Sequence, residues 1–264
     1  MRAHVWLAVL ALTGCNLVLD LAPPPTSDAD AAIDAVTIPA PLWSMSDDFE
    51  QGNLARWTGQ VQSAGASIDV ATSGALSGCC AMHAVVPAGA TGYAYAIISW
   101  PQATPSYAAV DSGTIAVRAN VRAVALDRDT REMAFDEGGE QGLSFATNGL
   151  GSADATTTWG FLLKNPANAG FSLQSTRDVA LGDWHCVEFV INVASAGHLA
   201  IYMDDDPVSL REGDADTTVD VGWDSLQLGL AYASGQTDTE IFIDDAKIAL
   251  YPDTYHAIHL GCTP

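Results

Sequence analysis

The stretch TIAVRANVRAVAL, residues 114–126, indicates most clearly how this chain folds. Apolar residues alternate there with Arg118, Asn120 and Arg122, so one side of the segment is apolar and the other polar. A period of two is that of a β-strand with one buried face. The segment is therefore predicted to be a strand that covers a core with one side and carries two arginines and an asparagine on the other.

Short runs of the same kind follow on both sides of this segment, separated by Gly, Asn, Asp and Pro. CVEFVINV (186–193) and HLAIYM (198–203) are predicted to form a hairpin, and DDDP (204–207) a turn. No segment keeps apolar residues at helical spacing over three turns, so the pattern favours an all-β sandwich or jelly roll. Further predicted strands are 92–99, 141–147, 157–164, 171–175, 225–233 and 239–250.

The N-terminus has the pattern of an export signal over residues 1–14, with a basic start and an apolar run that is too short to span a membrane. Leu12-Thr13-Gly14-Cys15 resembles the bacterial lipobox, which implies lipidation at Cys15 and anchoring to the envelope, at the outer membrane or cell surface. The alternative is an ordinary secretory leader. Residues 15–41, rich in Pro, Ala and Asp, are predicted to be a tether.

Residues 42–264 are long enough for one domain with its own core. The whole chain has 32 acidic and 10 basic residues and a formal net charge of −22. Such a charge disfavours nucleic acid and anionic lipid headgroups, and it disfavours polyanionic sugars unless a local basic cleft intervenes. It favours divalent cations, although a saline habitat also explains the acidity.

Four cysteines follow the lipobox, at positions 79, 80, 186 and 262. Exported chains form disulfides, and four cysteines allow three connectivities, among which spacing alone does not choose.

Three segments carry a resemblance to a known superfamily: DDFEQGNLARW (47–57), LGDWHCVEFVINVASAGHLAIYMDDDPV (181–208) and SLQLGLAYASGQTDTEIFIDDAKIAL…HLGC (225–262). They resemble the concanavalin-A-like jelly rolls, which include laminin-G-like lectins, laminarinase-type glucanases and alginate lyases. The resemblance implies a β-sandwich of two antiparallel sheets. It also implies a disulfide between Cys186 and Cys262, which leaves Cys79 and Cys80 to pair with each other or stay free.

Similarity to jelly-roll carbohydrate-binding modules further implies a structural Ca²⁺ between the first and last strands. The ligands carried over are Glu50 and Asp245, with Asp48 and Asp244 as second choices. Clustered carboxylates suit Ca²⁺, which takes six to eight oxygen ligands. The alternative is that Asp47-Asp48 begin a turn and Asp244-Asp245 mark a bulge in the last strand.

A sugar-binding face is the second hypothesis. The polar residues of the strands around 118 and 188 can pair with sugar hydroxyls if both sets face one groove, and aromatic rings can stack on sugar rings. The alternative is that the polar faces are merely solvated and the tryptophans lie in the core. The candidates are Arg118, Asn120, Arg122, Trp159, Glu188, Asn192 and Tyr232, with Trp184, Trp223, Tyr93 and Tyr95 as further aromatic residues.

Motifs for catalysis are missing from the sequence. Neither VEFVIN nor TEIFIDD supplies the second glutamate of a glucanase strand, there is no Gly-x-Ser-x-Gly, and the alginate lyase signatures QIH, QVH and YxKAG do not occur. The sequence therefore predicts a lipid-anchored, carbohydrate-binding jelly-roll protein without catalytic activity. The alternatives are a polysaccharide lyase or glycoside hydrolase of the same fold, or a structural or adhesion protein of the envelope.

Overall fold

A computed structural model of the chain describes residues 40–264 except 90, 128, 138–139, 149–155, 164–170, 176–178, 255–257 and 263–264. The predicted export signal, Cys15 and almost all of the tether lie outside the described residues. Residues 39–264 form one compact unit. Within the described part of this unit the regular structure is all β-strand, and no helix is long and apolar enough to cross a membrane.

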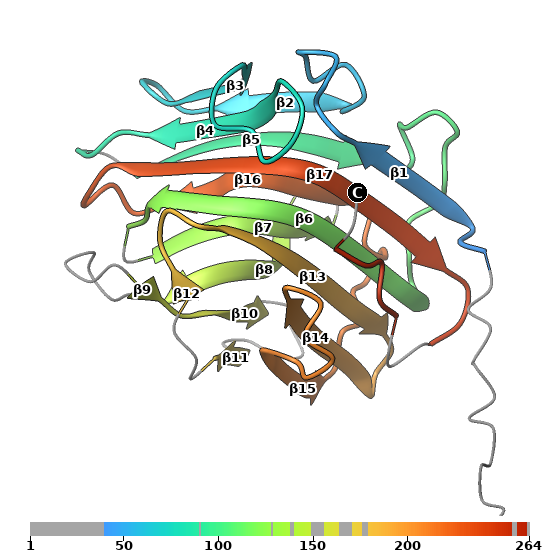
Figure 1. Cartoon of the computed structure of the whole chain (residues 1–264). Helices are drawn as coiled ribbons and strands as arrows, with labels where there is room; N and C mark the ends of the chain where they lie inside the picture. The colour runs from blue at the N-terminus through green and yellow to red at the C-terminus, as the bar shows by residue number, and fades with distance from the viewer. Residues whose placement is uncertain are drawn as a thin grey trace, which may run out of the picture. The chain divides into compact units, whose positions relative to one another are not determined.

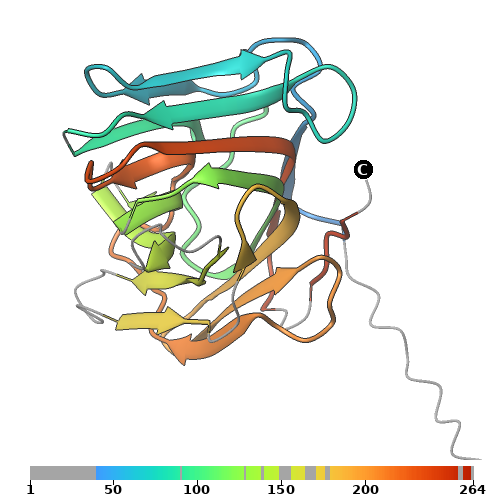
Figure 2. The ribbon, with the colours of Figure 1, turned by 60° about the vertical axis from the view of Figure 1, so that its left-hand side comes forward.

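Two antiparallel sheets lie face to face (Figures 1 and 2). The first sheet has the order β15-β14-β13-β6-β17-β4-β3, and β1 also pairs with β17. One half of β17 pairs with β4 and the other half with β1, so the first and last strands of the domain lie side by side. Its strands are β1 (Trp43–Asp47), β3 (Ser67–Ala71), β4 (Ala81–Val86), β6 (Gly113–Ala125), β13 (Trp184–Val193), β14 (Gly197–Met203), β15 (Arg211–Ala215) and β17 (Thr239–Tyr251).

The second sheet has the order β11-β10-β8-β7-β16-β5-β2, and a separate two-stranded sheet joins β9 to β12. Antiparallel sheets packed in this way confirm the predicted jelly-roll sandwich. The strands of the second sheet are β2 (Gly59–Gln62), β5 (Gly92–Ser99), β7 (Asp129–Glu137), β8 (Glu140–Asn148), β10 (Trp159–Leu163), β11 (Phe171–Gln174) and β16 (Ser225–Ala233); the small sheet consists of β9 (Thr156–Thr157) and β12 (Val179–Ala180).

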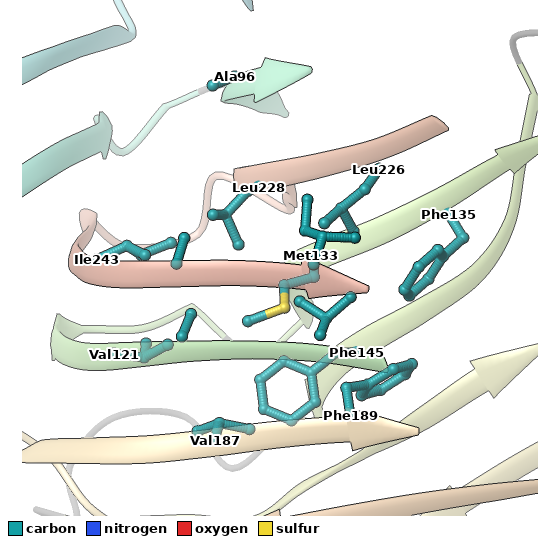
Figure 3. Packing of buried hydrophobic residues seen from close by; sticks show 14 of the residues in the cluster. Ala96, Val121, Met133, Phe135, Phe145, Val187, Phe189, Leu226, Leu228 and Ile243 are labelled. Carbon is teal, nitrogen blue, oxygen red and sulfur yellow. The ribbon is translucent and has the colours of Figure 1, made fainter. Parts of the chain in front are cut away.

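The hydrophobic core fills the space between the two sheets (Figure 3). Val121 and Phe189 of the first sheet meet Phe135 and Phe145 of the second, and the ring centroids of Phe135 and Phe189 are 5.5 Å apart. Because each fully buried side chain of this size contributes about 1.5–3 kcal/mol, this interface accounts for most of the favourable free energy of folding.

The alternation read from residues 114–126 is confirmed by β6, whose apolar residues point into this core. The hairpin of β13 and β14 is also confirmed, and a turn follows it at Asp204 and Asp205, both with φ of 57°. Strand β17 runs on through Asp244-Asp245 with a bulge, at which Asp245 has a φ of 47°. Asp244-Asp245 therefore mark a bulge in the last strand, as the alternative stated.

Candidate functional site

Arg118 and Glu188 lie opposite each other on β6 and β13, on the face of the first sheet that points away from the core. Both are buried, because the segment after β17 crosses this face (Figure 1). Arg118 Nη1 donates a hydrogen bond to the carbonyl oxygen of Gly261 at 2.8 Å. Glu188 Oε1 accepts one from the amide of Gly261 at 2.7 Å, and its Oε2 lies 2.9 Å from His259 Nδ1. These side chains hold the C-terminal segment, which corrects the prediction that they line one sugar-binding groove together; Arg118 also borders a separate pocket beside Asp245.

The two predicted asparagines on this face are buried and bonded within the chain as well. Asn192 Oδ1 accepts a hydrogen bond from the hydroxyl of Thr114 at 2.9 Å, and Asn120 Nδ2 donates to Asp245 Oδ2 at 3.3 Å. Fully buried amides with such partners stabilise the sheet and offer little to a ligand. Their prediction as sugar-binding residues is corrected for the same reason as that of Arg118 and Glu188.

The remaining predicted residues lie elsewhere. The guanidinium of Arg122 sits between two rings, 5.5 Å from the centroid of Trp184 and 4.5 Å from that of Phe242. Trp159 is fully buried in the core, so the prediction that it stacks on a sugar is wrong. Tyr232 is on β16, in the second sheet.

Disulfides join Cys186 to Cys262 and Cys79 to Cys80. The first confirms the pairing that the superfamily resemblance implied, and it ties the end of the C-terminal segment to β13. The second shows that Cys79 and Cys80 pair with each other, which the sequence had left open.

The four carboxylates predicted to bind calcium do not form one site. Glu50 accepts hydrogen bonds from the amides of Cys79 and Cys80, and Asp244 from those of Leu76 and Ser77. The described residues contain no group of three or more His, Cys, Asp or Glu side chains placed to hold a metal ion. The carboxylates of Glu50 and Asp244 are engaged by backbone amides of the chain itself.

The other two predicted ligands, Asp48 and Asp245, line one pocket together with Arg56, Arg118 and Lys247. The physical argument for calcium was that clustered carboxylates need a cation to relieve their repulsion. Basic side chains line the same pocket, so positive charge from the chain itself lies near these two carboxylates. Calcium binding itself stays a prediction from the sequence; loss of thermal stability in EDTA and its recovery with Ca²⁺ would support it.

The outer face of the second sheet carries a different set of side chains. Leu226 and Leu228 of β16 point into the core, so Gln227 between them points outward. By the same alternation, Tyr93 and Tyr95 of β5 lie on this outer face. Their ring centroids are 5.9 Å apart, and Tyr93 is 40% exposed. Tyr93 therefore offers an accessible aromatic ring, with the half-buried ring of Tyr95 beside it.

Polar groups continue the surface across β16 onto β7. Gln227 Nε2 donates a hydrogen bond to Asp136 Oδ2 at 2.6 Å. Further along the same strands, the guanidinium of Arg131 lies 4.8 Å from the ring centroid of Tyr232. We name the set Tyr93, Tyr95, Arg131, Asp136, Gln227 and Tyr232 the tyrosine face.

Asp136 is the unusual member of the tyrosine face. It is only 1% exposed, and its Oδ1 has no hydrogen-bond partner among the residues that the structure describes. Burial raises the pKa of Asp136 to about 6; the hydrogen bond from Gln227 opposes this increase, and the charge of Asp224 adds to it. Burial likewise raises the pKa of Tyr95, with a further contribution from the charge of Asp136. A carboxyl that titrates near neutrality beside a tyrosine is typical of functional sites.

Sequence reasoning missed Asp136, Gln227 and the whole strand β7. The segment DTREMAFDE, residues 129–137, is rich in charge, although Met133 and Phe135 alternate in it at strand spacing. Gly138-Gly139 follow in the sequence, and a two-glycine connection between alternating runs is a hairpin signal that would have identified the strand.

Comparison with known proteins supports the fold assignment. No family model matches the chain, and no curated protein matches it in sequence. Among solved structures, the cellulose-induced protein Cip1 has a TM-score of 0.57 at 14% identity over 81% of this chain and 100% of its own. An endo-β-1,4-glucuronan lyase from the fungus Trichoderma reesei has a TM-score of 0.54 at 16% identity, over 80% and 99%.

The alginate lyase Aly36B has a TM-score of 0.55 at 12% identity, over 83% of this chain and 100% of its own. At such identities the likeness is one of fold. The chain is therefore a jelly-roll β-sandwich of two antiparallel sheets, similar in architecture to polysaccharide lyases.

Proposed function

We propose that this protein binds a neutral polysaccharide or glycoconjugate with the tyrosine face while a lipid on Cys15 holds it to the bacterial envelope. The observation that carries the proposal is the pair of neighbouring rings on the outer face of β5, the exposed Tyr93 and the half-buried Tyr95. Aromatic rings pack against the apolar faces of sugar rings. Gln227 and Asp136 are buried and bonded to each other beneath this surface, so they support the tyrosines from within the sheet. The net charge of −22 favours a neutral polymer over a polyanionic one.

The structural neighbours support a carbohydrate as the ligand. Two of them are named as lyases of polysaccharides, one of glucuronan and one of alginate. The names describe those proteins, and a shared fold hosts many functions, so the proposal depends on the side chains of the tyrosine face.

The test is a glycan array with residues 39–264, followed by titration of the best ligand into the variant Tyr93→Ala/Tyr95→Ala. Covering roughly 50 Å² of one ring contributes about 1.3 kcal/mol, which is about tenfold in affinity for each tyrosine. We expect the double variant to bind at least tenfold more weakly. Val208→Ala, which removes an exposed apolar side chain elsewhere, is the matched control. Unchanged affinity of the double variant would contradict the proposal.

Catalysis is the second candidate, and the raised pKa of Asp136 favours it. A carboxyl with a pKa of about 6 can donate a proton near neutral pH, which is what a general acid requires. Laminarin, alginate and similar polymers are incubated with the protein and the products separated by chromatography. We expect binding without products. New reducing or unsaturated ends that disappear with Asp136→Asn would replace the binding proposal with an enzymatic one.

Anchoring through Cys15 is tested in cells. The variant Cys15→Ser cannot receive the lipid, so the protein should move from the membrane fraction to the soluble fraction of the envelope. A protein that stays with the membrane after this change has another attachment, and the lipobox interpretation is then wrong.

A further inference from the structure

A pocket of about 510 Å³ opens on the outer face of the first sheet, where the end of β1 meets the bulge of β17 and the C-terminal segment. Leu260 of that segment forms one wall. The pocket is on the opposite side of the sandwich from the tyrosine face, because the two sheets turn their outer faces away from each other. Its polar lining is Ser46, Asp47, Asp48, Arg56, Arg118, Asp245 and Lys247. Of the three carboxylates, Asp47 is buried and accepts hydrogen bonds from the amide of Phe49 and the indole of Trp57.

Three basic side chains meet in this pocket, although the whole chain has only 10 Lys and Arg among 264 residues. Neither Arg56 nor Lys247 has a carboxylate within 4 Å among the described residues. Burial raises the pKa of Asp47, and the charge of nearby Arg56 partly offsets that increase without an ion pair. In so acidic a protein, two cationic groups left without an ionic partner in one pocket point to an anionic ligand.

The carboxylates of the pocket already have donors from the chain. Asp48 Oδ1 accepts a hydrogen bond from the amide of Glu50 at 3.2 Å, and Asp245 Oδ2 accepts the bond from Asn120. Each carboxylate accepts more than one hydrogen bond, so both keep acceptor capacity for hydroxyl groups. A ligand that fits this lining carries one negative charge and several hydroxyls.

Arg118 is held rigidly against the floor of the pocket. Its Nη1 donates to the carbonyl oxygen of Gly261 and its Nη2 to that of Asp245, both at 2.8 Å. Both acceptors are neutral carbonyl oxygens. Its fixed guanidinium adds to the positive electrostatic potential that Arg56 and Lys247 create in the pocket. Because Arg118 is already ordered, it loses no side-chain entropy when a ligand binds.

We propose that this pocket binds a small polyhydroxylated carboxylate, such as a sugar acid. Lys247 and Arg56 bind its carboxylate, and Asp48, Asp245 and Ser46 accept hydrogen bonds from its hydroxyls. The net charge of the protein repels an anion at long range, but at 0.15 M salt this repulsion is screened over about 8 Å, so the cations inside the pocket decide the binding.

Isothermal titration of residues 39–264 with glucuronate, glucose and acetate tests the proposal. Glucose has the hydroxyls without the charge, and acetate has the charge without the hydroxyls. We expect glucuronate to bind, and glucose and acetate to bind at least about tenfold more weakly. The proposal is overturned if glucuronate at about 10 mM gives no heat of binding. It is also overturned if glucose or acetate binds with the same affinity as glucuronate.

Variants locate the binding. Lys247→Gln and Arg56→Gln should each weaken glucuronate binding about tenfold or more. Arg56 also donates a hydrogen bond to the carbonyl oxygen of Ser46, so the unchanged melting temperature of the free protein is expected for Lys247→Gln. Arg211→Gln removes the same charge from β15, outside the pocket, and should have no effect. Binding that survives both pocket variants contradicts the assignment. Tyr93→Ala/Tyr95→Ala should leave glucuronate binding unchanged. The proposal for this pocket and the proposal for the tyrosine face can therefore be contradicted independently.

Discussion

Replacing Cys186 and Cys262 together by serine should lower the melting temperature by about 10–15 °C. The disulfide joins residues 76 positions apart, and closing a loop of that length restricts the unfolded chain by about 4–5 kcal/mol. For a domain of this size each kcal/mol corresponds to about 2–4 °C. Release of the C-terminal segment adds to the loss, because Glu188 would then lose its contacts to Gly261 and His259. Thermal unfolding followed by circular dichroism measures the change.

The matched control is Cys79→Ser/Cys80→Ser, which removes a disulfide between adjacent residues. So short a link constrains little of the unfolded chain, and its loss should change the melting temperature far less. If the two double variants unfold at the same temperature, the covalent link at Cys262 contributes nothing beyond the hydrogen bonds of the C-terminal segment.

Asp136→Asn should stabilise the protein at neutral pH and much less at pH 4. The pKa of Asp136 is about 6 in the folded protein and 3.8 as its reference value. Between these values the folded state holds a proton that the unfolded state has released, so stability falls as the pH rises through this window. Above about pH 7 the loss is complete and amounts to roughly 3 kcal/mol, since one pKa unit corresponds to about 1.36 kcal/mol. Asparagine is neutral at every pH, so the variant does not lose this stability.

We expect the variant to melt about 5–10 °C higher than the wild type at pH 7.5, with the difference shrinking towards pH 4. Asp183→Asn, the same substitution at an exposed position, should give no pH-dependent difference. A gain of equal size at both pH values would mean that the amide packs better for reasons unrelated to ionisation. No gain at pH 7.5 would mean that Asp136 is ionised in the folded protein without penalty.

Local patterns predicted a large part of the fold. The alternation around Arg118 identified β6 and the side of the strand on which each residue lies, and the runs around Phe189 and Ile201 identified the β13–β14 hairpin. Both patterns are reliable because the side-chain period of a strand is set by its own backbone. Strand β7 was missed because Glu132 and Asp136, both buried, occupy positions that are usually solvated.

The candidate site was predicted less well, and Glu188 is the instructive residue. Its place on a strand and its face of that strand were as expected, and it lies opposite Arg118, which the sugar-face hypothesis had required as a condition. Its partners Gly261 and His259 are more than 70 positions away, and nothing in the pattern around Glu188 indicates that they cover it. Gln227 is the opposite case, because its run was predicted as a strand but its pairing with Asp136 depends on a neighbouring strand that was not recognised.

By itself, the sequence determined the class of the fold, most of the strands and which side chains share a face, since each of these follows from the spacing of residues along one strand. Only the tertiary structure decided which polar face is covered by the C-terminal segment and which carries accessible tyrosines. The physical reason is that a period of two assigns each residue to one of two faces, whereas burial, pKa and availability to a ligand depend on what packs over that face, and this is contributed by residues far away in the chain.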